Sequence, residues 1–324
     1  MLKTIRWGIL GASKFALEQM APAIHLASGA KLAALATSSN SKALAFQALQ
    51  SDLRIHDSYE ALLSDPEIDA VYVPLPNHMH IEWTLKALDA GKHVLCEKPL
   101  AMNASDFDQV IQRRNSTGLL AAEAYMILHH PQWHKAKELY EAGRIGKLLY
   151  VDGIFTYDNS ADPNNIRNKP DTGGGSLPDI GVYTFGSARF VTSEEPISVD
   201  AQIKRENGVD VFAHVIADFP SFRYNSVTSM RMYPRQYMAF HGDKGVMKLN
   251  CPFNPNVFGQ AELTLERAGM VTETIRWPET NHYVLQVESF GRSIQIEEEY
   301  LCTLEFSRGT QEMIDMVLAT ELRS

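Results

Sequence analysis

The sequence predicts an α/β protein: a Rossmann-type, doubly wound parallel sheet, followed by an α+β domain with a large, mostly antiparallel open sheet. Short apolar runs alternate with helical patterns over about the first 120 residues, as in repeated βαβ units. From about residue 197 to 276 the apolar residues alternate as in half-buried strands. A chain of 324 residues is long for one domain, so we expect two, at 1–122 and 123–324.

In the first domain, each apolar run is short enough for a buried parallel strand, and the segments between the runs are rich in Ala and Leu. The expected strands are 5–10, 31–37, 69–75, 93–98 and 119–125. The expected helices are 15–28, 41–50, 78–90 and 105–116. Gly29, Gly91 and Gly118 follow helical patterns directly, where glycines commonly end helices.

The second domain is expected to begin with a helix and then to become rich in strands. The helix covers 131–142, a Pro/Asn/Gly-rich loop covers 158–178, and another helix starts near Asp179. Helical patterns return over 282–295 and 303–322 after the strands.

The composition excludes several classes of protein. The net charge of −9 argues against a nucleic-acid binder and against docking on an anionic membrane. Three widely spaced cysteines, an odd number, fit a reduced protein better than a disulfide framework. No apolar stretch approaches the ~18 residues of a transmembrane helix. We therefore expect a cytoplasmic protein.

The turn after the first strand fits a dinucleotide site. "GILGASKFA" places Gly11, Ser13 and Ala16 on the G-x-G-x-x-G/A template, with Lys14 and Phe15 between them. Gly11 permits the tight turn, a small residue at 13 lets backbone amides approach a pyrophosphate, and Ala16 lets the helix pack on the strand. The alternative is a plain βα turn without a ligand.

The end of the second strand indicates the cofactor. An acidic residue there would hold the ribose 2′-hydroxyl of NAD, but the segment offers Thr37, Ser38 and then Lys42. Hydroxyls beside a cation suit the 2′-phosphate of NADP, and Lys14 could add charge. The alternative is that these hydroxyls cap the next helix and Lys42 is a surface charge. NADP(H) is favoured and NAD(H) remains possible.

The stretch "GKHVLCEKPLA" ends an apolar strand with two opposite charges. Pro99 disfavours a helical backbone at Lys98, so Lys98 lies at the carboxyl end of a parallel strand, where such sheets bind ligands. Glu97 points the other way along the strand. The alternative for Lys98 is a rim lysine that reaches to water.

Three motifs together resemble the glucose–fructose oxidoreductase/inositol dehydrogenase family, written Gfo/Idh/MocA. They are "WGILGASKFA" (7–16), "VYVPLPNHMHIEWTLKALDAGKHVLCEKPLA" (71–101) and "GGGSLPDIGVYTF" (173–185). The glycine turn resembles the NADP-dependent 1,5-anhydrofructose reductase members. The Asp-x-Gly-x-Tyr form of the last motif resembles the dihydrodiol and D-xylose dehydrogenase members.

The resemblance implies roles for individual residues. Lys98 would contact the nicotinamide ribose and the reacting hydroxyl, and Asp179 would hydrogen-bond the substrate. Tyr183 stands where many relatives carry a catalytic histidine. The cofactor crevice would be lined by Pro76, Asn77, His80, Glu97 and Lys98 together with the glycine turn.

The chemistry of these residue types supports this assignment. Asp179 and Tyr183 are four residues apart and share a face if a helix starts here. A nearby lysine ammonium favours the phenolate of Tyr183, which can then take the hydroxyl proton. Alternatively, Asp179 caps a helix after Pro178 and Tyr183 is a core aromatic residue.

Two further segments contain polar residues that could bind a ligand. The long loop is predicted to face the substrate, with Asn165 and Arg167 as contacts, or else to be an arm of an oligomer. His130 and His134 are four apart, but Pro131 indicates that the helix starts after His130, which makes His130 a cap. We predict no metal site.

The sequence therefore predicts an NADP(H)-dependent oxidoreductase that acts on a sugar, polyol or related cyclic diol. A homodimer or homotetramer is expected. The alternatives are an NAD-dependent polyol dehydrogenase of the inositol type and an NAD(P)-binding regulator without catalysis.

Overall fold

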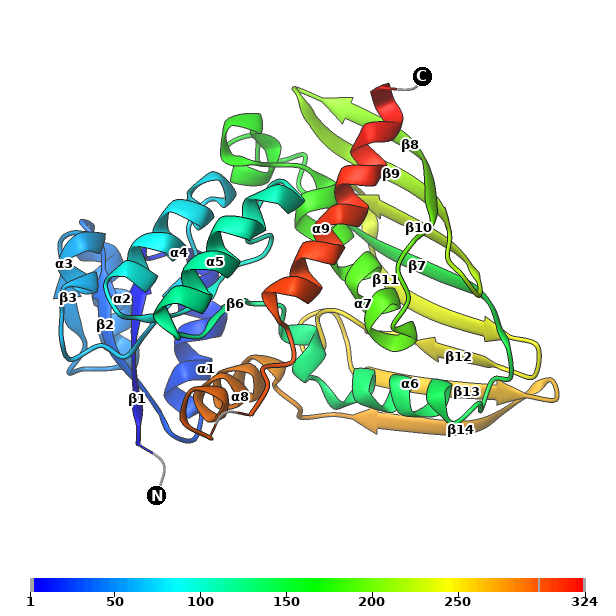
Figure 1. The fold of residues 1–324 in the computed structure, drawn as a ribbon, viewed down its shortest axis with the longest axis horizontal. Helices are drawn as coiled ribbons and strands as arrows, with labels where there is room; N and C mark the ends of the chain where they lie inside the picture. Colours follow the sequence, from blue (N-terminus) through cyan, green and yellow to red (C-terminus); the bar gives the residue numbers. More distant parts are fainter. Residues whose placement is uncertain (1–2, 297, 323–324) are drawn as a thin grey trace. The chain divides into compact units, whose positions relative to one another are not determined.

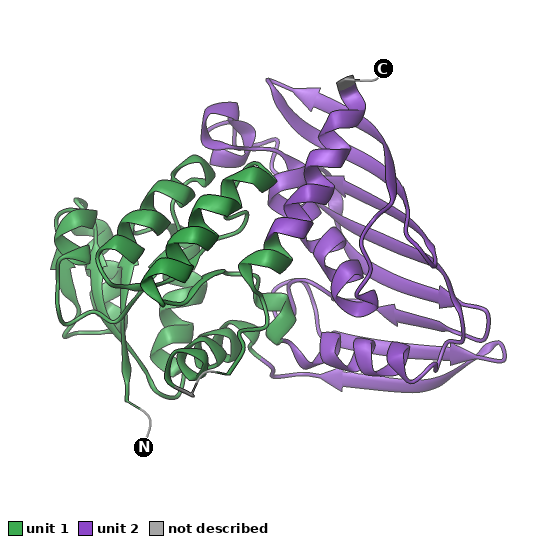
Figure 2. Ribbon diagram, viewed as in Figure 1, with its two compact units in different colours: residues 1–129, 281–307 green, residues 130–280, 308–324 purple. Residues whose placement is uncertain are grey.

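The computed structural model describes residues 3–296 and 298–322, and the chain forms two compact units (Figure 2). The first unit comprises residues 1–129 and 281–307, and the second comprises 130–280 and 308–324. The division therefore differs from the expected boundary after residue 122. The segment 281–307 comes from far along the chain, so no local signal at residue 122 could indicate it.

The first unit contains a six-stranded parallel sheet of order β3-β2-β1-β4-β5-β6 (Figure 1). The strands are β1 (Ile5–Leu10), β2 (Ala30–Ala36), β3 (Arg54–His56), β4 (Ala70–Val73), β5 (His93–Cys96) and β6 (Ala121–Glu123). The order reverses between β1 and β4, which is the switch point of a Rossmann fold. The predicted doubly wound sheet is confirmed. Strand β3 was not among the expected strands, because this edge strand is short and partly exposed.

Helices cover both faces of this sheet. They are η1 (Ala16–Met20) with α1 (Ala21–Leu26), α2 (Asn40–Leu49), α3 (Tyr59–Leu63), η2 (Asn77–Met79) with α4 (His80–Asp89), η3 (Ala104–Asp106) with α5 (Phe107–Thr117), η4 (Met126–His129) and α8 (His282–Ile296). Figure 1 shows α8, in orange, beside α1. The ring centroid of Phe290 lies 5.1 Å from that of Trp7, so α8 packs against β1.

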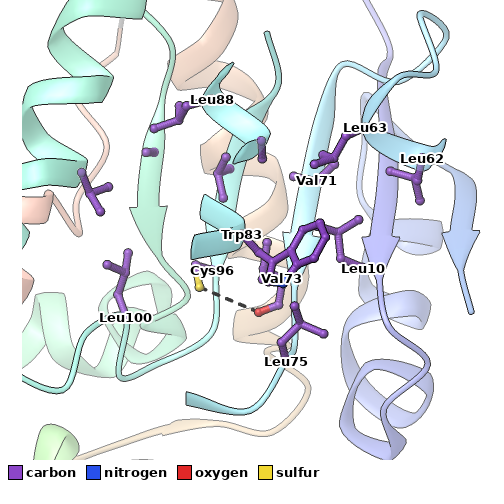
Figure 3. Close-up of a cluster of buried hydrophobic side chains, with 14 of the residues drawn as sticks. Leu10, Leu62, Leu63, Val71, Val73, Leu75, Trp83, Leu88, Cys96 and Leu100 are labelled. Carbon is purple, nitrogen blue, oxygen red and sulfur yellow. Dashed lines mark hydrogen bonds between the residues drawn. The ribbon is translucent and has the colours of Figure 1, made fainter. Parts of the chain in front are cut away.

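The core of the first unit explains why its strands read as continuous apolar runs. Side chains of β4, β5 and α4 form one buried cluster, in which Val73, Trp83 and Cys96 lie together (Figure 3). The Cys96 thiol donates to the Val73 carbonyl oxygen at 3.9 Å. Strands that are covered on both faces have no polar side to alternate with.

The second unit contains an eight-stranded sheet of order β14-β13-β12-β11-β7-β10-β9-β8. The strands are β7 (Leu148–Asp158), β8 (Ser198–Glu206), β9 (Val209–Asp218), β10 (Arg223–Ser229), β11 (Arg231–Gly242), β12 (Val246–Leu249), β13 (Ala261–Arg267) and β14 (Met270–Trp277). Every neighbouring pair is antiparallel except β7 and β10, which are parallel. The predicted mostly antiparallel sheet is confirmed.

Helices lie on one face of the second sheet, where α7 packs on β7 and α6 on β13 (Figure 1). The helical segments of this part of the chain are α6 (Pro131–Glu141), η5 (Ile166–Asn168), η6 (Pro170–Thr172), η7 (Leu177–Gly181), α7 (Val182–Thr192), α9 (Leu304–Ala319) and η8 (Thr320–Leu322). Across residues 3–296 and 298–322, none of the helices combines the length and the apolar character that crossing a membrane requires.

Candidate active site

The glycine turn follows β1 at the switch point of the first sheet. Gly11 has φ +100°, a conformation that side chains rarely adopt. A Cβ atom on Gly11 would lie 3.0 Å from Leu75 Cδ2 and 3.3 Å from the Tyr59 hydroxyl oxygen. Both the backbone conformation and the close approach of Leu75 therefore require glycine here.

The first helix begins directly after this turn. Ser13 Oγ accepts a hydrogen bond from Ala16 N at 3.0 Å, so Ser13 caps the helix. Ala16 is fully buried, as expected for a residue that packs the helix on the sheet. Lys14 is exposed and lies 3.7 Å from Glu18, while Phe15 makes an edge contact with Tyr283 of α8, with centroids 5.8 Å apart. A tight glycine turn that leads into a helix N-terminus fits a pyrophosphate.

The hydroxyl-rich segment after β2 partly caps the next helix. Thr37 Oγ1 accepts from Ser39 N at 3.2 Å, and Ser39 Oγ accepts from Lys42 N at 3.4 Å. The capping interpretation therefore holds for Ser39. Ser38 and Lys42 are exposed, so their polar groups remain accessible to a phosphate.

Lys98 follows the carboxyl end of β5, which ends at Cys96, two residues earlier than expected. Its side chain is half-buried, and its peptide bond to Pro99 is cis. Glu97 pairs within the first unit: Tyr72 Oη donates to its Oε1 at 2.5 Å, and Lys98 N donates to its Oε2 at 3.3 Å. Burial and the Glu97 carboxylate hold the pKa of Tyr72 well above its ordinary value.

Glu123 is a carboxylate near Lys98 that the sequence analysis missed. It is 4% exposed, and its Oε1 accepts from Leu100 N at 2.8 Å. Burial raises the pKa of Glu123, while the positive charge of Lys98 acts to lower it. The available signal was a lone carboxylate inside the apolar run 119–125.

His80 joins the two loops that follow β4 and β5. Its Nδ1 lies 2.7 Å from the Pro99 carbonyl oxygen, and its Nε2 lies 2.7 Å from the Leu75 carbonyl oxygen. Burial lowers the pKa of His80, against the opposing effect of these two carbonyls. The resemblance implied that His80 lines the cofactor crevice. The ring is instead fully buried and faces two carbonyl oxygens. Pro76 and Asn77, by contrast, are half-buried at the start of η2.

In the second unit, Asp179 lies in η7, a π-helical turn that precedes α7. Arg167 Nε lies 2.9 Å from Asp179 Oδ1, and Tyr157 Oη donates to Asp179 Oδ2 at 2.6 Å. The Asp179 carboxylate therefore binds an arginine and a tyrosine. The Asp179 charge raises the pKa of Arg167, and burial followed by the same charge raises the pKa of Tyr157.

Tyr183 lies in the first turn of α7 and is 5% exposed. Its ring packs against Phe155 and Phe253, with centroid distances of 5.6 and 5.7 Å. Tyr183 also interacts electrostatically with Arg167. The tyrosine is therefore an aromatic core residue whose hydroxyl group is near a cation, so the two interpretations of Tyr183 are compatible.

The loop before η7 is fixed by tight turns. Asn165 Oδ1 accepts from Arg167 N at 3.1 Å, so the Asn165 side chain shapes the backbone of η5. Gly175 has φ +133°, and its N donates to the Arg167 carbonyl oxygen at 3.0 Å. Asp210 Oδ2 accepts from Ser176 Oγ at 2.6 Å and from Leu177 N at 2.7 Å. Asp210 lies on β9, and no sequence signal linked it to this turn.

The histidine pair of α6 behaves as expected from the position of Pro131. The helix begins at Pro131, and His130 Nδ1 accepts from Gln132 N at 3.1 Å, so the predicted cap is confirmed. In the part of the chain that the structure describes, no group of three or more His, Cys, Asp or Glu residues could hold a metal ion.

Two family models match the chain. Residues 5–125 match the oxidoreductase family with an NAD-binding Rossmann fold, and residues 133–248 match the Gfo/Idh/MocA C-terminal domain. The fold and these matches define a nicotinamide-dependent oxidoreductase. The chain belongs to the Gfo/Idh/MocA family, as its motifs indicated.

Relatives and a solved structure cover nearly the whole chain. An uncharacterized oxidoreductase of Rhizobium meliloti is 35% identical over 97% of this chain and 96% of its own. A D-xylose 1-dehydrogenase (NADP(+)) of Haloferax volcanii is 33% identical over 96% and 95%. The crystal structure of a 3-ketoreductase from Actinomadura kijaniata with NADP and TDP-benzene is similar at a TM-score of 0.90, with 27% identity and 98% coverage of both chains.

Proposed function

We propose that this protein transfers a hydride between NADP(H) and a carbon–oxygen centre of a sugar, polyol or related cyclic diol. The main support is the position of Lys98, directly after the carboxyl end of a parallel strand in the Rossmann unit. The names of the relatives add a xylose dehydrogenase that uses NADP(+) and a 3-ketoreductase crystallised with NADP.

Tyr183 and Lys98 have different roles in the proposed reaction. The bound nicotinamide supplies the hydride acceptor or donor. In the oxidative direction, the Tyr183 phenolate takes the proton of the substrate hydroxyl as the C–H hydride leaves and a C=O bond forms. Lys98 stabilises the negative charge on the reacting oxygen. Within the second unit, the positive charge of Arg167 acts on Tyr183 in the direction that favours the phenolate, and Asp179 offsets part of that charge.

The segment after β2 is proposed to select the cofactor. Ser38 and Lys42 are exposed and Thr37 lies beside them, so hydroxyl groups and an ammonium group can bind the ribose 2′-phosphate. Pro76, Asn77 and the glycine turn would hold the rest of the dinucleotide, with His80 and Glu97 supporting the loops from behind.

The first experiment measures initial rates of NADPH and NADH formation over a panel of aldoses, polyols and cyclic diols. Wild type and Lys98→Met are compared, and carbonyl reduction is assayed where oxidation is silent. We expect turnover that favours NADP⁺ and falls by at least a hundredfold in Lys98→Met, on the scale of a lost acid–base or electrostatic group. Cofactor binding without turnover in either direction would contradict the proposal and indicate a regulator.

We further propose a cytoplasmic homodimer or homotetramer. Cys96, Cys251 and Cys302 are buried, and within the described residues they form no disulfide, which suits a reducing compartment. On the sheet face opposite α7, Tyr150 and Ile216 are 39% and 38% exposed, and a second subunit would cover such apolar groups. Light scattering that gives the mass of one chain would contradict the oligomer.

A further inference from the structure

Tyr157, Asp179 and Arg167 form a cluster in the second unit, and their side chains differ in exposure to solvent. Tyr157 lies on β7, which pairs with both β10 and β11, and its hydroxyl group donates to Asp179 Oδ2. The Asp179 side chain is 12% exposed, whereas that of Arg167 is 41% exposed. Arg167 is therefore the more exposed partner of this ion pair.

The outer part of Arg167 is available for hydrogen bonding. Its Nε is used by Asp179. Among residues 3–296 and 298–322, the structure provides no hydrogen-bond acceptor for its two Nη groups. A guanidinium has five N–H donors in a rigid fork, so most of its donors can meet a ligand.

The backbone of Arg167 is held in place before any ligand binds. Its N donates to Asn165 Oδ1 and its carbonyl oxygen accepts from Gly175 N. A Cβ atom on Gly174 would lie 2.4 Å from that carbonyl oxygen, so the turn packs directly on it. A donor on a fixed backbone, with a buried carboxylate behind it, is preorganised for binding.

The charge of the cluster narrows the ligand class. Asp179 offsets the positive charge of Arg167 at 2.9 Å, so the pair offers N–H donors with little net charge. Such a pair suits the oxygen of an uncharged hydroxyl or carbonyl group. A carboxylate or phosphate would meet the Asp179 charge directly behind the guanidinium.

We propose that Arg167 binds an uncharged oxygen of the sugar substrate directly, and that Asp179 and Tyr157 are positioning residues that orient it. This inference rests on the proposed function, since it concerns the substrate of the same site. The proposal adds Tyr157 to the site. It also assigns Asp179 the role of orienting Arg167, in addition to any hydrogen bond that Asp179 makes to the substrate.

The test is a binding cycle between the enzyme and its sugar. Isothermal titration calorimetry with NADPH present gives the dissociation constants of a neutral sugar, its monodeoxy analogues and the matched uronic acid, for wild type and Arg167→Met. We expect Arg167→Met to weaken the parent sugar by about tenfold or more. One deoxy analogue should bind wild type as weakly as the parent sugar binds Arg167→Met. The affinity of that analogue should not fall further in the variant, because the hydroxyl group that Arg167 contacts is already missing.

Several outcomes would overturn the proposal. Independent losses for every deoxy analogue would mean that Arg167 touches none of the hydroxyls. Affinity for the uronic acid above that for the neutral sugar, lost selectively in Arg167→Met, would mean that the ligand is anionic. Failure of the whole panel to bind wild type would exclude the ligand class. Binding without turnover would instead reject the proposed function alone, because the cycle still tests Arg167.

Kinetics and chemical rescue separate recognition from a purely structural role. Tyr157→Phe should raise KM severalfold with a smaller change in kcat, because it loosens the orientation of Asp179 and Arg167. Millimolar guanidinium should partly restore the sugar affinity of Arg167→Ala. Arg308→Met is the matched control, since Arg308 is also 41% exposed and pairs with Glu312; its affinity should equal that of wild type. Absence of both rescue and the KM effect would leave Arg167 a structural ion pair and contradict the proposal.

Discussion

The two units hold their proposed site residues by different means. In the first unit, Lys98 and the glycine turn follow strand ends, and buried side chains bind the backbone of their loops, as His80 binds the carbonyls of Leu75 and Pro99. In the second unit, charged and phenolic side chains hold one another, as Arg167 and Tyr157 hold Asp179. Hydrogen bonds to the loop backbone suit a cofactor that is the same across a family. A network of side chains can change with the substrate, because single substitutions alter it.

At neutral pH, the largest effect is expected when the hydrogen bond that holds the loop backbone of the first unit is removed. Burial favours the neutral ring of His80, which has one N–H, so His80→Leu removes the donor to one of the two buried carbonyl oxygens. An unsatisfied buried group costs about 1–3 kcal/mol, so we expect the free energy of unfolding to fall by about that amount, with weaker NADPH binding. Urea unfolding measures the first effect and calorimetric titration the second.

The control for this prediction is His25→Leu, because His25 is exposed and bonds only Gln50 among the described residues. Its free energy of unfolding should change by no more than about 0.5 kcal/mol. If His80→Leu behaved like this control, that carbonyl oxygen would have another donor, and the contrast between the units would fail.

The second prediction concerns the response of the second unit to acid. Burial lowers the pKa of His130 to about 4, whereas an unfolded histidine titrates near 6.5. The unfolded chain therefore takes up a proton first as the pH falls. The stability that His130 contributes is complete above pH 6.5 and is lost between about 6.5 and 4, by about 3 kcal/mol in all.

His130→Asn tests this because asparagine can still cap α6 but does not titrate. The difference in free energy of unfolding between wild type and variant, measured by urea titration at several pH values, should shift against wild type as the pH falls through this window. A difference independent of pH would show that His130 titrates normally and that its environment is not apolar.

The sequence predicted most of the first unit because its signals are local. Apolar runs marked β1, β2, β4 and β5 within a few residues, and Pro99 located Lys98. The missed β3 has no apolar run.

The supporting residues of both units were out of reach of local patterns. The hydrogen bonds of Tyr157, Glu123 and Asp210 span 22, 23 and 34 positions along the chain. For the same reason, the sequence predicted Asp179 and Tyr183 as a pair but not the partners of Asp179. The order of the eight-stranded sheet likewise depends on pairings such as that of β7 with β10.

The smallest effect is expected on cofactor affinity when Lys42 is replaced. Lys42 is an exposed residue of the first unit and lies outside its buried core. An exposed ion pair contributes about 1 kcal/mol or less, so Lys42→Met should weaken NADPH binding by up to about fivefold. NADH lacks the 2′-phosphate, so its affinity should be unchanged, and salt should reduce the NADPH effect by screening.

Lys31→Met is the control, because Lys31 lies near the amino end of β2 and pairs with Asp52. Equal losses for NADPH and NADH, or none for either, would place the 2′-phosphate away from Lys42. Discrimination between the cofactors would then depend on the hydroxyl groups of Thr37 and Ser38 alone, and the first unit would select its cofactor, like its fold, through short-range backbone and hydroxyl contacts.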